Sequence, residues 1–326
     1  MSRYKKENLL NALTKFLKHI YLSYIPNAKD NIKQITIKVL FLVCIVSLIL
    51  SSVFIADYFF QGKQQDKVVE KSREIWNDTQ TLEETEKSEE TTETEETKPL
   101  TQDEKIQLLL AENSDFKGWI TIKGTKVDNP IYQTTNNSFY LDHNQNKRKS
   151  VYGALFFDYE NVITEEKTDQ NLVIFGHEMK NGSMFGQLKK YKTIAFYKEH
   201  PMFDFSTIYK SSKYKIYSVF LLNSKKDDDN GYIYNIYRNT FANEEDFNSW
   251  TSEAFERSVI NTNVDVKYGD NIVTLVTCSN DFKDARLIVM ARELREGESA
   301  YVDTTKATLN PNPRYPEVWY VERGLR

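Results

Sequence analysis

The chain has 326 residues, 28% of them charged, and a formal net charge of −4. This length suits one sizeable domain with appended segments, and the weak net charge disfavours the strongly basic surface of a nucleic-acid-binding protein. The sequence contains no Cys/His cluster with zinc spacing, no glycine-rich phosphate loop and no dinucleotide-binding fingerprint. We therefore expect neither a metal nor a cofactor.

Residues 1–38 form a basic arm, in which eight Lys and Arg residues stand against two acidic ones. Apolar residues recur in this arm at near-helical spacing, so the arm suits the surface of an anionic membrane leaflet. The excess of positive charge predicts that this end of the chain stays in the cytoplasm.

Residues 39–56 contain no charged side chain. Such a run is adequate for a single transmembrane helix, which we place at residues 39–60, with the bulk of the chain outside the cell. The alternative is a cleaved signal peptide. The long preceding arm and the lack of an obvious cleavage site after Ser52 count against that alternative.

Residues 61–98 are predicted to be a disordered acidic linker, since eight Glu and seven Thr occupy the twenty positions from 79 to 98. Such a composition cannot bury enough apolar surface to offset the entropy of ordering the chain. A globular domain is expected at residues 99–295. A Pro-containing C-terminal extension, residues 296–326, follows it, and its sequence indicates no function.

Capping and periodicity predict the helices of the domain. Thr101 with Glu104 resembles a capping box that begins a helix. Residues 184–197 and 241–259 are also expected to be helical, and strands are expected around residues 214–222.

The end of the domain predicts a hairpin. Residues 272–278 alternate in polarity, Ser279 to Asp281 supply turn residues, and residues 286–291 form the return strand. Cys278 and Arg286 would then face each other across the open end. The only other cysteine is Cys44, in the apolar run. A lone thiol in an exported domain suggests that the thiol itself is used.

A histidine follows a second strand-like run, in Leu172–His177. Cys278, His177 and Arg286 are the residue types of a thiol nucleophile, its proton partner and a cation for an oxyanion. Each residue has an ordinary structural alternative: Cys278 could be a small buried hydrophobe, His177 a loop residue with its hydrogen bonds satisfied, and Arg286 a solvated strand end. Only tertiary structure can bring His177 to the other two.

The run Thr274–Cys278, TLVTC, with Arg286 eight residues on and FGHEM upstream at 175–179, resembles the sortases. These are membrane-anchored cysteine transpeptidases of Gram-positive bacteria. Further segments resemble class B members in particular: 116–131, 137–141, 153–158 and 177–185. The resemblance covers roughly residues 101–295. It implies a mainly β fold with helices: an eight-stranded β-barrel, an N-terminal helical segment and a long helix between late strands.

The resemblance also implies the reaction. Cys278 would attack a C-terminal sorting signal of a secreted protein, one resembling NPxT(G/N), while Arg286 stabilises the oxyanion and His177 acts as general acid and base. An amine of a peptidoglycan precursor or of a pilin, rather than water, would resolve the thioacyl enzyme.

Two further groups of residues are candidates for the site. By position, Asn137 and Leu141 match residues that line the class B signal groove, and Tyr232 and Ile233 are weaker candidates. Ordinary surface or barrel packing is the alternative for these four. His143 and His200 are rival bases, although neither ends an apolar strand.

Two other functions compete with transpeptidation. A secreted cysteine endopeptidase of the papain type carries its Cys early and its His late, whereas here the order is His, Cys, Arg. A membrane-tethered surface scaffold without enzymatic activity leaves the lone thiol unexplained.

Overall fold

The computed structural model describes residues 3–78, 99–225 and 229–325. The chain divides into two compact units, residues 1–63 and residues 64–326. The helices are α1 (Arg3–Tyr24), α2 (Ile32–Trp76), α3 (Gln102–Glu112), α4 (Ile194–Glu199), α5 (Glu244–Arg257) and α6 (Glu317–Val321), and the short 3₁₀ turns are η1 (Phe139–Leu141), η2 (Leu188–Lys192) and η4 (Thr304–Lys306).

The first unit contains α1 and the first part of α2. Lys38 of α2 donates to the Asp30 carboxylate at 2.8 Å and to the Leu22 carbonyl oxygen at 2.5 Å. The Tyr24 ring stacks on Phe41 with ring centroids 4.9 Å apart. These contacts tie the end of α1 to α2 at the point where the uncharged run begins. In length and composition, α2 is sufficient to cross a membrane.

The structure differs from the predicted linker at residues 61–76, which continue α2. The prediction is wrong there because one face of this segment is buried in the second unit. Val69 is 3% exposed, the Arg73 Nε donates to the Asp128 carbonyl oxygen at 2.7 Å, and Trp76 stacks on Trp119. The Glu/Thr-rich residues 79–98 lie outside the described residues.

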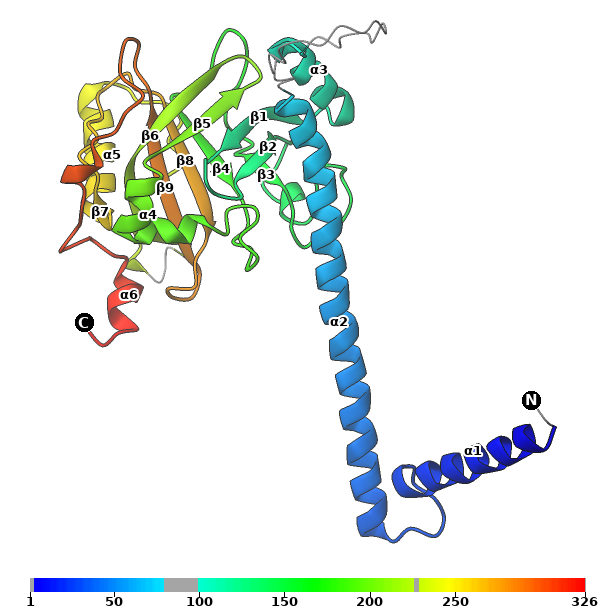
Figure 1. Ribbon diagram of the computed structural model, residues 1–326. Helices are drawn as coiled ribbons and strands as arrows, with labels where there is room; N and C mark the ends of the chain where they lie inside the picture. Colours follow the sequence, from blue (N-terminus) through cyan, green and yellow to red (C-terminus); the bar gives the residue numbers. More distant parts are fainter. Residues whose placement is uncertain (1–2, 79–98, 226–228, 326) are drawn as a thin grey trace, which may run out of the picture. The chain divides into compact units, whose positions relative to one another are not determined.

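The second unit is built on a closed barrel of eight strands in the order β1-β2-β3-β4-β8-β9-β6-β5, which confirms the predicted fold class (Figure 1). The barrel strands are β1 (Phe116–Thr121), β2 (Asp128–Tyr132), β3 (Leu155–Phe157), β4 (Asn171–Phe175), β5 (Met202–Thr207), β6 (Ser211–Asn223), β8 (Ile272–Cys278) and β9 (Ala285–Glu293). Outside the barrel, β7 (Ile260–Asn261) pairs with β10 (Thr308–Leu309).

The capping box of α3 is confirmed, since the Thr101 side chain accepts from the Glu104 backbone N–H and the Glu104 carboxylate accepts from the Thr101 backbone N–H. The helix expected at 241–259 is also present, as α5, and it begins after Asn243, whose side chain accepts from the Asp246 N–H. It lies against the barrel, where Trp250 belongs to a buried cluster (Figure 1).

The helix expected at 184–197 is wrong in its first part. Met184 has a left-handed φ of 50° and forms a β-bridge with Glu178, so the chain turns there instead of starting a helix. Helical turns begin only at η2, and a break at Thr193 separates η2 from α4.

Candidate active site

Strand register brings the three site residues together. Strands β8 and β9 are antiparallel and pair Cys278 with Arg286, which confirms the predicted hairpin. Strands β4 and β8 are parallel and pair Phe175 with Val276. His177 therefore follows β4 at the level at which Cys278 ends β8. Because neighbouring strands lie about 4.8 Å apart, all three side chains start from adjacent strand ends.

A glycine allows His177 to follow the strand so closely. The Gly176 N–H still donates to the Val276 carbonyl oxygen at 3.1 Å. A Cβ at Gly176 would lie 2.3 Å from Leu155 Cδ2 and 2.7 Å from Phe185 Cδ2. Only a residue without a side chain fits between these two groups, which explains the glycine before the histidine.

The imidazole of His177 is oriented by a backbone contact, with its Nε2 lying 2.6 Å from the Leu141 carbonyl oxygen. A carbonyl oxygen only accepts, so in the neutral ring this contact favours the tautomer with the proton on Nε2 and an unprotonated Nδ1. Gly153 permits the approach of the neighbouring loop, since its φ is +58° and an added Cβ would lie 3.2 Å from His177 Cδ2.

The thiol and the guanidinium are both accessible. Cys278 is exposed, although the preceding residues of β8 are buried. Arg286 is half-buried, and its Nη1 donates to the Ala285 carbonyl oxygen at 3.0 Å. Within the described part of the chain, the hydrogen bonds of the Arg286 side chain go to the carbonyl oxygens of Asp284 and Ala285, and Arg286 forms no ion pair with a carboxylate.

These residues line one cavity of about 650 Å³ with largely apolar walls. Three of the four candidate substrate-binding residues, Asn137, Leu141 and Ile233, line this cavity. Tyr232 does not, because its hydroxyl donates to the Glu253 carboxylate at 2.6 Å on the outer side of the same loop. The cavity also contains residues that sequence reasoning missed: Phe156, Phe175, Leu222, Asn223, Ser224, Tyr234, Asn235, Ile236, Tyr237, Val276 and Thr277.

The pKa of Tyr237 reflects the charges around the cavity. Burial raises the pKa of its phenol above the ordinary value, the negative charge of Asp158 raises it further, and the positive charge of Arg286 opposes both. Its ring lies 6.2 Å from that of Phe175. The positive charge of Arg286 is therefore felt at Tyr237, on the wall of the cavity. The sequence could have indicated Phe175, because this residue directly precedes Gly176 and His177. It could not have indicated Tyr237, which lies in an irregular segment with no such motif.

Asn137 forms part of the cavity wall, but its amide is already engaged. Its Nδ2 donates to the Asp158 carboxylate at 2.8 Å, and its Oδ1 accepts from the Tyr159 N–H at 2.9 Å. These bonds fix the amide between η1 and the segment after β3. Asn137 therefore contributes to the shape of the cavity at least as much as it offers a polar group to a ligand.

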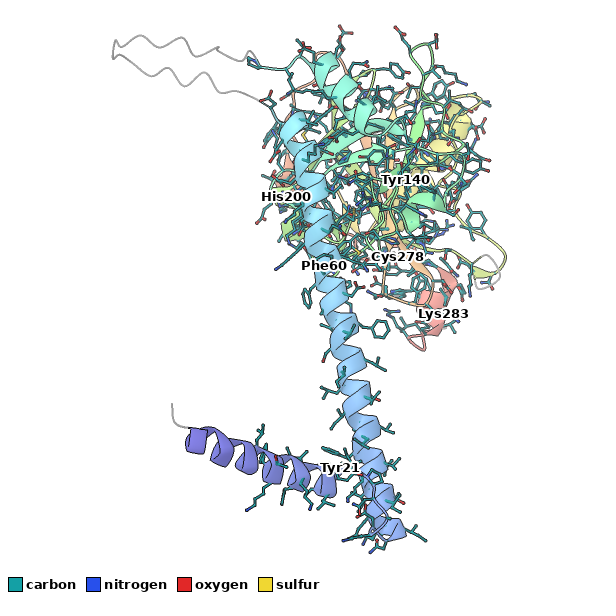
Figure 2. The ribbon with its side chains drawn as sticks, turned by 90° about the vertical axis from the view of Figure 1, so that its right-hand side faces the viewer. Tyr21, Phe60, Tyr140, His200, Cys278 and Lys283 are labelled. Atoms are coloured by element: carbon teal, nitrogen blue, oxygen red, sulfur yellow. The ribbon has the colours of Figure 1, made fainter. Side chains whose placement is uncertain are left out.

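The rival histidines lie elsewhere. The His143 ring stacks on Phe139 at 4.2 Å, and its Nδ1 lies 2.6 Å from the Asp142 carboxylate. His200 follows α4 and packs on Phe196, and Figure 2 shows it well apart from Cys278. Among the described residues that line the cavity, His177 is the one histidine.

Comparison with known proteins gives consistent results. The Sortase domain family model matches residues 120–294. The curated sortase B of Listeria monocytogenes is 35% identical over 182 residues, which cover 55% of this chain and 70% of that protein. The sortase B of Staphylococcus aureus is 28% identical over 185 residues, or 56% of this chain and 72% of that protein.

Solved structures agree with these matches. The sortase B of B. anthracis superposes with a TM-score of 0.58 at 26% identity, covering 73% of this chain and 99% of that one. The Clostridium perfringens sortase B gives a TM-score of 0.52 at 34% identity, covering 58% and 100%. The family match, the sequence identities and the eight-stranded barrel show that this chain belongs to the sortase family, and its relatives named here are class B sortases.

Proposed function

We propose that this chain is a cysteine transpeptidase that cleaves a C-terminal sorting signal of secreted proteins and transfers them to an amine acceptor. The observation that carries the proposal is the meeting of Cys278, His177 and Arg286 at three adjacent strand ends in one apolar cavity. The signal would resemble NPxT(G/N), and the acceptor would be a cell-wall precursor or a pilin.

The first half of the reaction forms a thioester. The Cys278 thiolate attacks the carbonyl carbon of the scissile peptide bond, and the carbonyl oxygen becomes an oxyanion. Arg286 donates to that oxyanion, since a guanidinium has five N–H donors and the backbone contact uses only part of them. His177, as imidazolium, gives its proton to the leaving amine as the C–N bond breaks.

The second half reverses these roles. An incoming amine attacks the thioester carbon, and His177 as a neutral base takes the proton that the amine loses. The second oxyanion collapses, the C–S bond breaks and the Cys278 thiolate is regenerated. Two solved relatives support the two partners. One is a Staphylococcus aureus sortase B–substrate complex, and the other is a sortase B complexed with triglycine.

The first unit supports a membrane location. We propose that the apolar part of α2 spans the membrane, with the N-terminus in the cytoplasm and the barrel outside. The contact of Tyr24 with Phe41 and the bonds of Lys38 hold the end of α1 where the uncharged run starts. That position suits a helix lying at the cytoplasmic surface of the bilayer. Protease treatment of intact cells and of inside-out vesicles would distinguish the two orientations.

Intact-mass measurement tests the reaction. The detergent-solubilised chain, given a signal peptide without amine, should gain the mass of the N-terminal acyl fragment, and Cys278→Ala should gain none. Triglycine in excess should then convert the acyl enzyme mainly to the amide product. Hydrolysed product as the main outcome would favour the endopeptidase, and acylation of the alanine variant would refute both.

A further inference from the structure

The C-terminal extension lies beyond residue 294, where the family match ends, yet it packs on the second unit. The β10–β7 pair holds it at Thr308 and Leu309. Arg314 then forms two ion pairs with α5, at 2.8 Å to Glu253 and 2.9 Å to Glu256. The last residues form α6, which lies near the end of the barrel that carries the β8–β9 turn (Figure 1).

One contact, from the residues that follow α6, reaches the turn that joins Cys278 to Arg286. Arg323 Nη2 donates to the Asp281 carbonyl oxygen at 3.2 Å. Figure 2 labels Lys283 of this turn beside the ribbon of α6, with Cys278 above it. On its other side the turn is held by Lys192, whose Nζ lies 2.6 Å from the Asp281 carboxylate.

A second contact reaches the segment that leads into another part of the cavity lining. The backbone N–H of Glu317 donates to Asp229 Oδ1 at 2.5 Å. Asp229 begins the segment that leads to Ile233 and Tyr237, both of which line the cavity. One five-residue helix with its flanks therefore contacts two segments that are far apart in the sequence and that border the same site.

The contact residues are themselves held in place. Tyr315 stacks on Trp319 with centroids 3.9 Å apart, and the Arg323 guanidinium lies 4.3 Å from the Trp319 ring centroid. Arg323 Nη1 also donates to the Trp319 carbonyl oxygen at 3.1 Å. This packing holds the Arg323 guanidinium with its Nη2 toward the Asp281 carbonyl oxygen, so the side chain needs no further ordering to make that bond.

We propose that residues 314–323, the C-terminal clasp, position the two segments that adjoin the cavity, the β8–β9 turn and the segment that leads from Asp229 to Ile233, and thereby set the affinity for the sorting signal. This inference rests on the proposed function. These two segments are irregular and have no strand partners. If they became ordered only when the peptide binds, the entropy lost would weaken the affinity, whereas a clasp that orders them beforehand removes this cost. Cys278 and Arg286 are paired within the barrel ladder, so the chemical step should depend little on the clasp.

The test compares Arg323→Ala with Val321→Ala in the full chain. Val321 is the last residue of α6, two residues before Arg323, and its side chain is exposed, so its variant controls for a general effect on α6. Affinity for a signal peptide is measured in the Cys278→Ala background, which separates binding from turnover. Hydrogen–deuterium exchange is measured without peptide over residues 229–237 and 279–284.

Arg323→Ala should raise Kd about tenfold and speed exchange in both segments, while leaving kcat in the Cys278 background within about twofold. Val321→Ala should change none of these. Unchanged exchange and affinity in Arg323→Ala would overturn the clasp, and so would equal effects of the two variants. Because exchange needs no substrate, an inactive chain whose two segments still respond to Arg323→Ala would refute the transpeptidase and not the positioning role.

Discussion

Gly176→Ala tests whether strand packing sets the position of His177, the proposed base. The added Cβ would lie 2.3 Å from Leu155 Cδ2 and 2.7 Å from Phe185 Cδ2, whereas ordinary carbon contacts begin at about 3.4 Å. The strand end carrying His177 must therefore move by about 1 Å or displace its neighbours. A displacement of this size in a catalytic group costs on the order of a hundredfold in rate.

The assay is the single-turnover rate of acylation by a signal peptide, with thermal unfolding measured in parallel. Gly176→Ala should lose on the order of a hundredfold in acylation rate, together with about 1–3 kcal/mol of stability from overpacking. Adding Leu155→Val removes the Cδ2 contact and should restore part of the rate. Gly269→Ala is the control, since its φ is +96° but nothing lies within 4 Å of the added Cβ. It should lose stability and keep activity.

A near wild-type acylation rate in Gly176→Ala would refute this reasoning. It would show either that the neighbours yield without moving His177 or that the imidazole position is not limiting. An equal loss of rate in Gly269→Ala would point to reduced folding as the cause.

Three further outcomes are expected. Arg286→Lys should fold normally and lose about a hundredfold or more in kcat, as for loss of an oxyanion donor, and a near wild-type rate would make Arg286 a surface residue. His177→Ala should be nearly inactive while His143→Ala keeps most activity, and the reverse order of activities would reassign the base. Wild-type kcat/KM should pass through a maximum with pH, because a thiolate and an imidazolium must coexist in the active enzyme. Hydrogen bonds from Arg292 and Lys215, outweighing burial, hold the pKa of Glu298 well below its usual range. The ionised Glu298 therefore stabilises the fold at neutral pH, and this contribution is lost as pH falls below about 4. Glu298→Gln should lower the free energy of unfolding by about 2 kcal/mol at pH 7 and should reduce its dependence on pH below neutrality, both measured by urea unfolding.

Local pattern predicted one part of the site well. The alternation in 272–278, the turn residues and the return strand lie within about twenty residues, so the facing of Cys278 and Arg286 followed from the sequence. The position of His177 depends on a parallel pairing between strands about a hundred residues apart. No local periodicity encodes that pairing, so only the family resemblance could suggest it.

The errors also have physical causes. Residues 61–76 are polar enough to suggest a linker, but the apolar face around Val69 and Trp76 is covered by the barrel. Tyr232 and Ile233 are neighbours in an irregular loop, and only Ile233 points into the cavity. Adjacent side chains of an extended segment diverge, so a loop assignment does not determine which one lines a site.

The exposure of Cys278, the proposed nucleophile, follows from where the outer layer of the barrel stops. Ile272, Val276 and Cys278 share one face of β8, and the first two are buried in the cluster that contains Trp250 of α5. That cover ends before Cys278, which opens into the cavity beside Ile233. The same strand therefore supplies a rigid, buried support and an accessible thiol.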